Sequence, residues 1–208
     1  MKAIGLISDV HATPSPIEEA LSIFEQAGVE KIFCAGDIAG YGDQLEQSIT
    51  RLVGNGCYSI LGNHDLLYLD RHANDLGNVA VAFFNQLTTS IDMTIADKRV
   101  YMVHGRPPDN CHDGIKLLDS EGQVQPDRVE LWADELQTLN CDVLVVGHTH
   151  QVFAERVGEI LVVNPGSSVF NPCCAILSLP EMTVQMFPLS NKKIEKPWNW
   201  SDYMIGRG

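Results

Sequence analysis

Short apolar runs of strand length recur along the chain, and most of them end abruptly at a glycine or a polar residue. They are rich in β-branched side chains, which favours strands. The seven runs are 3–8, 31–36, 57–62, 100–105, 142–147, 159–164 and 173–179. A chain with this pattern is constrained to bury its sheet beneath other elements.

Helical patterns separate the earlier runs. Residues 15–28 carry apolar side chains at helical spacing, with Ser15 predicted as the N-cap and Glu18 completing a capping box. Further helices are predicted over 43–54, about 72–87 and Asp127 to about Leu139. Helices alternate with strands early, and strands dominate later. This order predicts an α/β fold in which one sheet is covered by helices and a second sheet packs on the first.

Size, charge and cysteine content set the broad class. The chain has 208 residues, and we expect a single domain over 1–208 with residues 191–208 as a C-terminal tail packed on it. The absence of a long apolar stretch argues against a membrane partner, and an early Asp9 argues against a signal peptide, so we expect a cytoplasmic protein. The net charge of −13 disfavours nucleic-acid binding. The six cysteines form no C-x-x-C pair and are expected as free thiols.

Side chains that can bind metals follow five of the apolar runs. In chain order they are Asp9 and His11, Asp37, Asn63 and His64, His104, and finally His148 and His150. In α/β folds, sites assemble in the loops beyond the carboxyl ends of the strands. Asp, His and Asn together suit Mn, Fe, Zn or Ni. We therefore expect these residues to meet in a metal site.

His148 and His150 are separated by a single residue at the end of one run. Residues two apart in a strand point to the same side. Two imidazoles placed in this way could share one metal or hold two neighbouring metals, and the spacing alone leaves both arrangements open.

Taken in order, these motifs resemble those of the calcineurin-like metallophosphoesterase superfamily, in particular its small bacterial and archaeal members. The matching segments are Asp9-Val10-His11, Gly36-Asp37, Gly62-Asn63-His64-Asp65, His104-Gly105, Gly147-His148-Thr149-His150 and Asn164-Pro165-Gly166-Ser167. The resemblance spans roughly residues 4–168. It implies an α/β fold of two mixed β-sheets packed as a sandwich and flanked by helices.

The resemblance also implies two divalent metal ions, with manganese favoured and Fe, Zn, Ni or Co as alternatives. The first metal would be held by Asp9, His11, Asp37 and His150, and the second by Asp37, Asn63, His104 and His148. Asp37 would then bridge the two metals, and His148 and His150 would serve different ones.

The implied reaction is hydrolysis of phosphate mono- or diesters by a metal-activated water, with His64 as general acid and Asn63 assisting at the metal and the phosphate. The substrate is expected to be a small organic phosphate, with a preference for phosphodiesters or a broad range of small substrates. The alternatives are a phosphoprotein phosphatase and a non-catalytic scaffold of the same fold that binds proteins. The intact ligand set and the presence of His64 favour an enzyme.

One motif departs from the family pattern. Protein phosphatases of the superfamily carry Gly-Asp-x-x-Asp-Arg-Gly, whereas this chain has Gly40 and Tyr41 in place of the second Asp and the Arg. The difference argues against phosphoprotein phosphatase activity and leaves the residue that orients His64 unidentified. It also leaves open whether position 40 would accept an Asp.

Three polar residues near the motifs are further candidates for contact with substrate, namely Tyr41, Arg106 and His112. The sequence leaves the oligomeric state open, a homodimer included.

Overall fold

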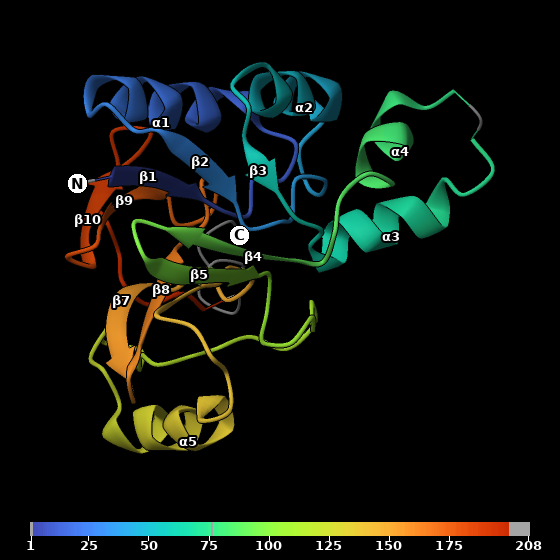
Figure 1. The fold of residues 1–208 in the computed structure, drawn as a ribbon. Helices are drawn as coiled ribbons and strands as arrows, with labels where there is room; N and C mark the ends of the chain where they lie inside the picture. Colours follow the sequence, from blue (N-terminus) through green and yellow to red (C-terminus); the bar gives the residue numbers. More distant parts are fainter. Residues whose placement is uncertain (1, 76, 200–208) are drawn as a thin grey trace.

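The chain alternates strands and helices in its first half and consists mainly of strands in its second. A computed structural model describes residues 2–75 and 77–199 (Figure 1). The first half runs β1 (Lys2–Ile7), α1 (Pro14–Gln26), β2 (Lys31–Cys34), α2 (Leu45–Gly54), β3 (Tyr58–Ser59), α3 (Asn63–Arg71) and α4 (Val79–Phe84). The second half runs β4 (Ser90–Ile95), β5 (Lys98–Val103), α5 (Pro126–Leu136), β6 (Val143–Val145), β7 (Val152–Val157), β8 (Ile160–Pro165), β9 (Cys173–Leu179) and β10 (Thr183–Pro188).

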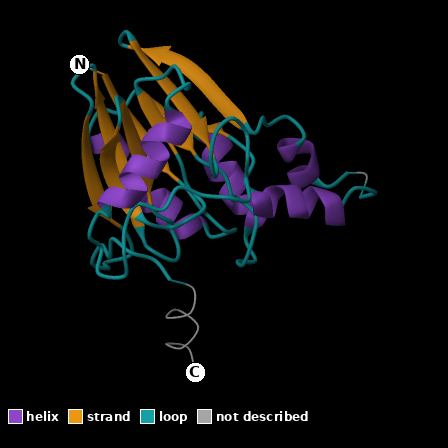
Figure 2. Ribbon diagram, turned by 90° about the horizontal axis from the view of Figure 1, so that it is seen from below, coloured by secondary structure: helices purple, strands orange, loops and turns teal. Residues whose placement is uncertain are grey.

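The strands form two mixed five-stranded sheets, which confirms the predicted fold class. The first has the order β10-β9-β1-β2-β3 and the second the order β4-β5-β6-β8-β7. In the first sheet, β1 pairs in parallel with β2 and antiparallel with β9. In the second, β6 lies parallel to both β5 and β8. The parallel strands at the centre of each sheet therefore end at a common edge, where loops gather (Figure 2).

The main hydrophobic core lies between the two sheets. Ile4, Leu6 and Phe33 of the first sheet pack in one buried cluster with Met102 and Val145 of the second. A second cluster lies beneath α1 and α2, and a third lies beneath α5. Both faces of each central strand are therefore covered, which explains why these strands are almost continuously apolar. Within the described ranges, no helix is long and apolar enough to cross a membrane.

Two helix predictions differ from the structure. The helix predicted over about 72–87 is replaced by α3 and α4, and residues 72–78 between them are not helical. Asn78 starts α4, because its side chain accepts hydrogen bonds from the amides of Ala80 and Val81. The predicted capping box of the first helix is also wrong. That helix begins at Pro14, with Thr13 as an N-cap whose side chain makes no capping bond.

Three strands were not predicted from the sequence, namely β4, β7 and β10. Each is an edge strand of its sheet and belongs to an antiparallel hairpin with its neighbour in sequence. The strands β4 and β10 are partly exposed and alternate apolar with polar residues, so they show no apolar run. The strand β7 begins with only three apolar residues, Val152 to Ala154, before Glu155 and Arg156.

The segment predicted as a C-terminal tail is described as far as residue 199. The backbone amide of Val152 donates to the carbonyl of Lys196 at 2.9 Å. The side-chain amide of Asn171 donates to the carbonyl of Glu195. These bonds hold residues 195–196 beside β7 and the loop before β9, whereas residues 200–208 lie outside the described part of the chain.

A buried serine joins the two sheets at their common edge. The hydroxyl of Ser167, which follows β8, donates to the carbonyl of Asp9 after β1 at 2.8 Å. The same oxygen accepts from the amides of Val169 and Phe170 at 3.2 and 3.1 Å. One side chain therefore fixes the turn that carries Asp9 and the loop that follows β8.

Ser167→Ala should destabilise the protein while the neighbouring Ser168→Ala should not. The Ser167 change leaves a buried carbonyl and two amides without this partner, which should lower the free energy of unfolding by about 1–3 kcal/mol. The buried hydroxyl of Ser168 has no hydrogen-bond partner among the described residues, so its removal should leave stability unchanged or slightly raised. Urea denaturation in the presence of chelator measures both values. Equal losses in the two variants would contradict the role given to Ser167.

Candidate metal centre

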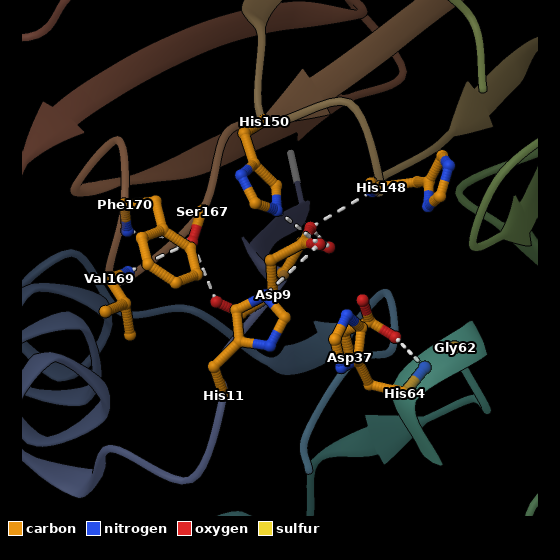
Figure 3. A network of polar contacts seen from close by, with 12 residues as sticks. Asp9, His11, Asp37, Gly62, His64, His148, His150, Ser167, Val169 and Phe170 are labelled. Atoms are coloured by element: carbon orange, nitrogen blue, oxygen red, sulfur yellow. Dashed lines mark hydrogen bonds and ion pairs between the residues drawn. The ribbon is translucent and has the colours of Figure 1, made fainter. Parts of the chain in front are cut away.

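The predicted ligands meet at the common edge of the two sheets, and Figure 3 shows Asp9, His11, Asp37, His148 and His150 gathered there. The turn after β1 carries Asp9 and His11, and the turn after β2 carries Asp37. The remaining ligands come from the first turn of α3 and from the ends of β5 and β6, namely Asn63, His104, His148 and His150. Both sheets therefore contribute to one site.

One group of ligands surrounds Asp9. Its Oδ1 atom lies 3.1 Å from Nε2 of His150 and 3.9 Å from Nε2 of His11. All three side chains are buried. Their ligand atoms lie within 4.8 Å of one another, a spacing that could hold one metal ion.

A second group surrounds Asn63. Its Oδ1 atom lies 3.2 Å from Nε2 of His104 and 3.0 Å from Nδ1 of His148. Nε2 of His104 lies 3.4 Å from Oδ2 of Asp37. The imidazole rings of His148 and His150 therefore contact different groups of ligands, although the backbone amide of His148 donates to Oδ2 of Asp9 at 3.1 Å. Figure 3 shows the His148 ring directed away from His150.

Asp37 lies between these groups. Its ligand atoms fall within 4.8 Å of those of Asp9 and His104 in one cluster, and within 4.8 Å of those of His11 and His64 in another. Its Oδ1 atom also accepts a hydrogen bond from the amide of His64 at 2.8 Å. The carboxylate is thus positioned where it can contact both sides of the site.

Most of the candidate ligands adopt a strained backbone conformation. Positive φ angles occur at Asp9 (53°), His11 (46°), Asp37 (53°), His148 (63°) and His150 (55°). This left-handed region is uncommon for residues other than glycine, and such strain concentrates at functional sites. The hydrogen bonds around each turn must therefore fix conformations that the residues would not adopt alone.

Close backbone contacts at two glycines pack the loops together. A Cβ atom at Gly62 would lie 2.2 Å from Oδ1 of Asp37, and one at Gly147 would lie 2.1 Å from Oγ of Ser8. Neither space can hold a side chain. The glycines of these motifs allow the loops to approach the carboxylates directly.

Burial and the imidazoles act on the two carboxylates in opposite directions. Burial raises the pKa of Asp9 and of Asp37. His150 lowers the pKa of Asp9, and His104 lowers that of Asp37, and this lowering outweighs the effect of burial. Both pKa values therefore lie below the usual range. Burial lowers the pKa of His104, yet Asp37 raises it to about 10 overall. Without a metal, a proton on His104 therefore balances part of the carboxylate charge.

The donor set fits a divalent cation. The carbonyl of Ala39 can only accept a hydrogen bond, so Nδ1 of His11 must donate to it at 3.2 Å, which leaves the lone pair on Nε2. Within the part of the chain that the structure describes, this buried Nε2 atom has no hydrogen-bond partner. Burial lowers the pKa of His11 to about 4, so the ring is neutral and able to bind a metal at neutral pH.

His64 lies beside the Asp9 group. Its ring centroid is 5.0 Å from that of His11. Among residues 2–75 and 77–199, no group lies within hydrogen-bonding distance of its ring nitrogens. Asp65 does not serve as its partner. The Asp65 carboxylate is buried and accepts hydrogen bonds from the amides of Ala39 and Gly62 at 2.6 and 2.9 Å, so it ties α3 to the Asp37 loop.

The Gly40 position cannot hold the Asp of the protein-phosphatase motif. Gly40 has a φ of 145°, and a Cβ atom there would lie 2.3 Å from Nδ1 of His11. The space that an aspartate would need is therefore taken by a candidate ligand.

The three further candidates for substrate contact lie in different surroundings. The Tyr41 ring lies 4.9 Å from the His64 ring. Arg106 instead forms ion pairs with Asp113 at 3.4 Å and Glu135 at 4.0 Å. His112 is exposed on the same loop as Asp113. Tyr41 alone of these three contacts the site within the described residues.

Two aromatic residues at the site were not predicted from the sequence. The Phe170 ring stacks on His150 at 5.4 Å, and the Trp198 ring lies 5.3 Å from His150. Neither belongs to a ligand motif, and Trp198 is distant in sequence from the other site residues. For Phe170, the only feature of the sequence that could have indicated a place at the site is that it closely follows the Asn164–Ser167 motif.

Comparisons with known proteins show the family to which the chain belongs. A sequence model of the calcineurin-like phosphoesterase superfamily domain matches residues 1–180. An uncharacterised protein of Methanocaldococcus jannaschii is 27% identical over 174 residues, which cover 78% of this chain and 68% of that protein. A phosphodiesterase of the same organism is 23% identical over 180 residues, covering 84% of this chain and 86% of that protein.

The fold also matches solved structures. A hypothetical protein of Pyrococcus horikoshii OT3 superposes with a TM-score of 0.72, covering 99% of this chain and 92% of its own, at 16% identity. At that identity the similarity concerns the fold alone. The match to the domain model, however, extends over most of the sequence and includes every predicted ligand. The chain belongs to the calcineurin-like phosphoesterase superfamily.

Proposed function

We propose that the protein is a dinuclear metal-dependent phosphodiesterase that acts on small organic phosphates. The observation that carries this proposal is the pair of adjoining ligand groups, one around Asp9 and one around Asn63, with Asp37 between them. The relative named as a phosphodiesterase supports the choice of ester.

One metal would be held by Asp9, His11, Asp37 and His150, and the other by Asp37, Asn63, His104 and His148. Two divalent cations, when bound, supply positive charge for the phosphoryl group and acidify a water molecule. Manganese is the first candidate, because oxygen and imidazole donors suit it, and Fe, Zn, Ni and Co remain candidates for the same reason.

The chain's own residues would position the ester and assist the departure of its leaving group. His64 lies beside the Asp9 group and is only partly buried, so its ring can approach a bound ester. Hydrolysis breaks a P–O bond, and the departing oxygen needs a proton, which His64 would donate as general acid. Asn63 would hold its metal through Oδ1.

The charges around the site favour a diester over a monoester. In the described residues, no Lys or Arg side chain forms an ion pair with Asp9, Asp37 or any other candidate ligand, and Arg106 is paired elsewhere. A phosphate monoester carries about twice the charge of a diester near neutral pH. A site whose positive charge would come only from its metals therefore suits the singly charged ester.

The first prediction concerns activity. With Mn²⁺ added, the purified protein should hydrolyse bis(p-nitrophenyl) phosphate, and chelator should abolish turnover because the ligand groups would be empty. Absorbance of released nitrophenolate measures the rate, with Ni, Co, Zn and Fe tested in parallel. Absence of turnover with all five metals would favour a scaffold that only binds proteins.

The second prediction separates metal binding from proton donation. Asp37→Ala should lose metal at both sites, because Asp37 lies between the two ligand groups. His64→Ala should keep both metals while its rate falls by roughly 10²–10⁴-fold. His72→Ala, an exposed histidine beside Asp75, is the matched control and should change neither property.

Elemental analysis of metal-loaded, desalted protein decides this comparison. Loss of metal from the His64 variant would show that His64 is a ligand, and retention of both metals by the Asp37 variant would exclude the proposed bridge.

The third prediction concerns the leaving group. A weakly acidic leaving group such as phenol departs more readily when it receives a proton, whereas the more acidic nitrophenol can depart as nitrophenolate without one. His64→Ala should therefore slow hydrolysis of methyl phenyl phosphate more than that of methyl p-nitrophenyl phosphate. The measurement is the ratio of the two rates in the wild type and in the variant. Equal losses on both esters would mean that His64 stabilises the phosphoryl group instead of donating a proton.

A further inference from the structure

An exposed aromatic side chain borders the Asp9 side of the metal centre. The ring centroid of Tyr41 lies 5.0 Å from that of His11 and 4.9 Å from that of His64. Tyr41 is 57% exposed although it contacts both of these rings. A large part of the Tyr41 surface is thus accessible close to His64, the proposed general acid.

The backbone holds Tyr41 in this place. The amide of Gly42 donates to the carbonyl of His11 at 2.9 Å, and the amide of Ala12 donates to the carbonyl of Ile38 at 2.7 Å. Gly40 lies so close to His11 that no side chain fits there. The turn that carries Tyr41 is therefore folded against the His11 turn, and the ring is presented by a fixed support.

The Phe170 ring packs nearly perpendicular to the Tyr41 ring. Phe170 lies 5.1 Å from Tyr41 with an interplanar angle of 82°. It also stacks on His150 with an interplanar angle of 14°. Its backbone amide is bound by Ser167, the residue that joins the two sheets. Phe170 therefore supports the Tyr41 ring from the side.

Aromatic rings recognise different groups from those recognised by cations. An arginine at position 41 would contact phosphate oxygens, whereas a tyrosine ring offers a flat apolar face. Such faces bind nucleobases by stacking, with little dependence on base identity.

We propose that Tyr41, supported by Phe170, binds a planar aromatic group of the substrate, so that the substrate is a nucleoside phosphoester. This inference rests on the proposed function, because it places the phosphate of that nucleoside at the ligand groups. One sugar separates a base from its 5′-phosphate. A base stacked on Tyr41 would therefore leave the phosphate on the side of His64, whose ring lies 4.9 Å from that of Tyr41, and of the proposed metal ligands.

The test compares AMP, the monoester that hydrolysis of a nucleoside 5′-phosphodiester would leave as product, with ribose 5-phosphate, which has the same sugar and the same doubly charged phosphate but no base. Calorimetry on the Mn²⁺-loaded protein measures both dissociation constants without requiring turnover. The wild type should bind AMP about tenfold more tightly, as expected for one stacked base. Tyr41→Leu should bring the two constants together, and Tyr41→Phe should keep the tenfold difference because it keeps the ring face.

Tyr58→Leu is the matched control. Tyr58 is also partly exposed, but its ring stacks on Phe33 in the first sheet, so this change should leave the ratio intact. Equal binding of AMP and ribose 5-phosphate by the wild type would overturn the proposal. So would an unchanged ratio in Tyr41→Leu, or a ratio lost in Tyr41→Phe, which would assign recognition to the hydroxyl.

Failure of this inference is distinguishable from failure of the proposed function. An active phosphodiesterase that binds both ligands equally contradicts only the role of Tyr41. A protein that prefers AMP through Tyr41 but hydrolyses no phosphodiester with any metal contradicts the catalytic proposal, and with it the nucleoside phosphoester as substrate, while the role of Tyr41 in binding the base stands.

Discussion

Two buried carboxylates, Asp9 and Asp37, lie at the junction of the two sheets, and the cost of burying their charge shapes the structure around them. A buried charge is tolerated only when it is paired and hydrogen-bonded. Oδ1 of Asp9 faces His150, and Asp37 faces His104 and the amide of His64. A divalent cation would satisfy both carboxylates better than the proton on His104 does, which makes the site a trap for metal in a chain of net charge −13.

The same junction explains the strain in the loops. Left-handed turns direct Asp9 and Asp37 inward from β1 and β2, which are neighbouring parallel strands of the first sheet, and Ser167 fixes the Asp9 turn from the opposite sheet. Asp65 performs the corresponding task for the Asp37 loop through two backbone amides. The packing of the two sheets and the geometry of the candidate metal centre therefore depend on each other, because the same hydrogen bonds stabilise both.

Much of this could be predicted from the sequence, because the central strands are buried on both faces and their ends carry ligand residues. The apolar runs before Asp9, Asp37 and His104 locate these strands, and the carboxyl ends of parallel strands meet by topology. Edge strands such as β4 and β10 carry no such run. The break between α3 and α4 depends on Asn78, whose capping role resembles ordinary loop composition.

Contacts between distant segments were the least predictable. Phe170 and Trp198 approach His150 only through the path of the chain after β8, which no local pattern encodes. The sequence shows that Gly40 and Tyr41 stand where phosphoprotein phosphatases carry Asp and Arg, but it does not show the structural reason for the difference. The structure supplies the reason at Gly40, since His11 occupies the space that a side chain would need.

The most direct test of the account is a crystal structure of the Mn²⁺-loaded protein with anomalous scattering recorded for manganese. Two anomalous peaks are expected, one contacting Asp9, His11 and His150, the other contacting Asn63, His104 and His148, with Asp37 between them. A single peak, or two peaks that both contact His150, would contradict the assignment of His148 and His150 to different metals.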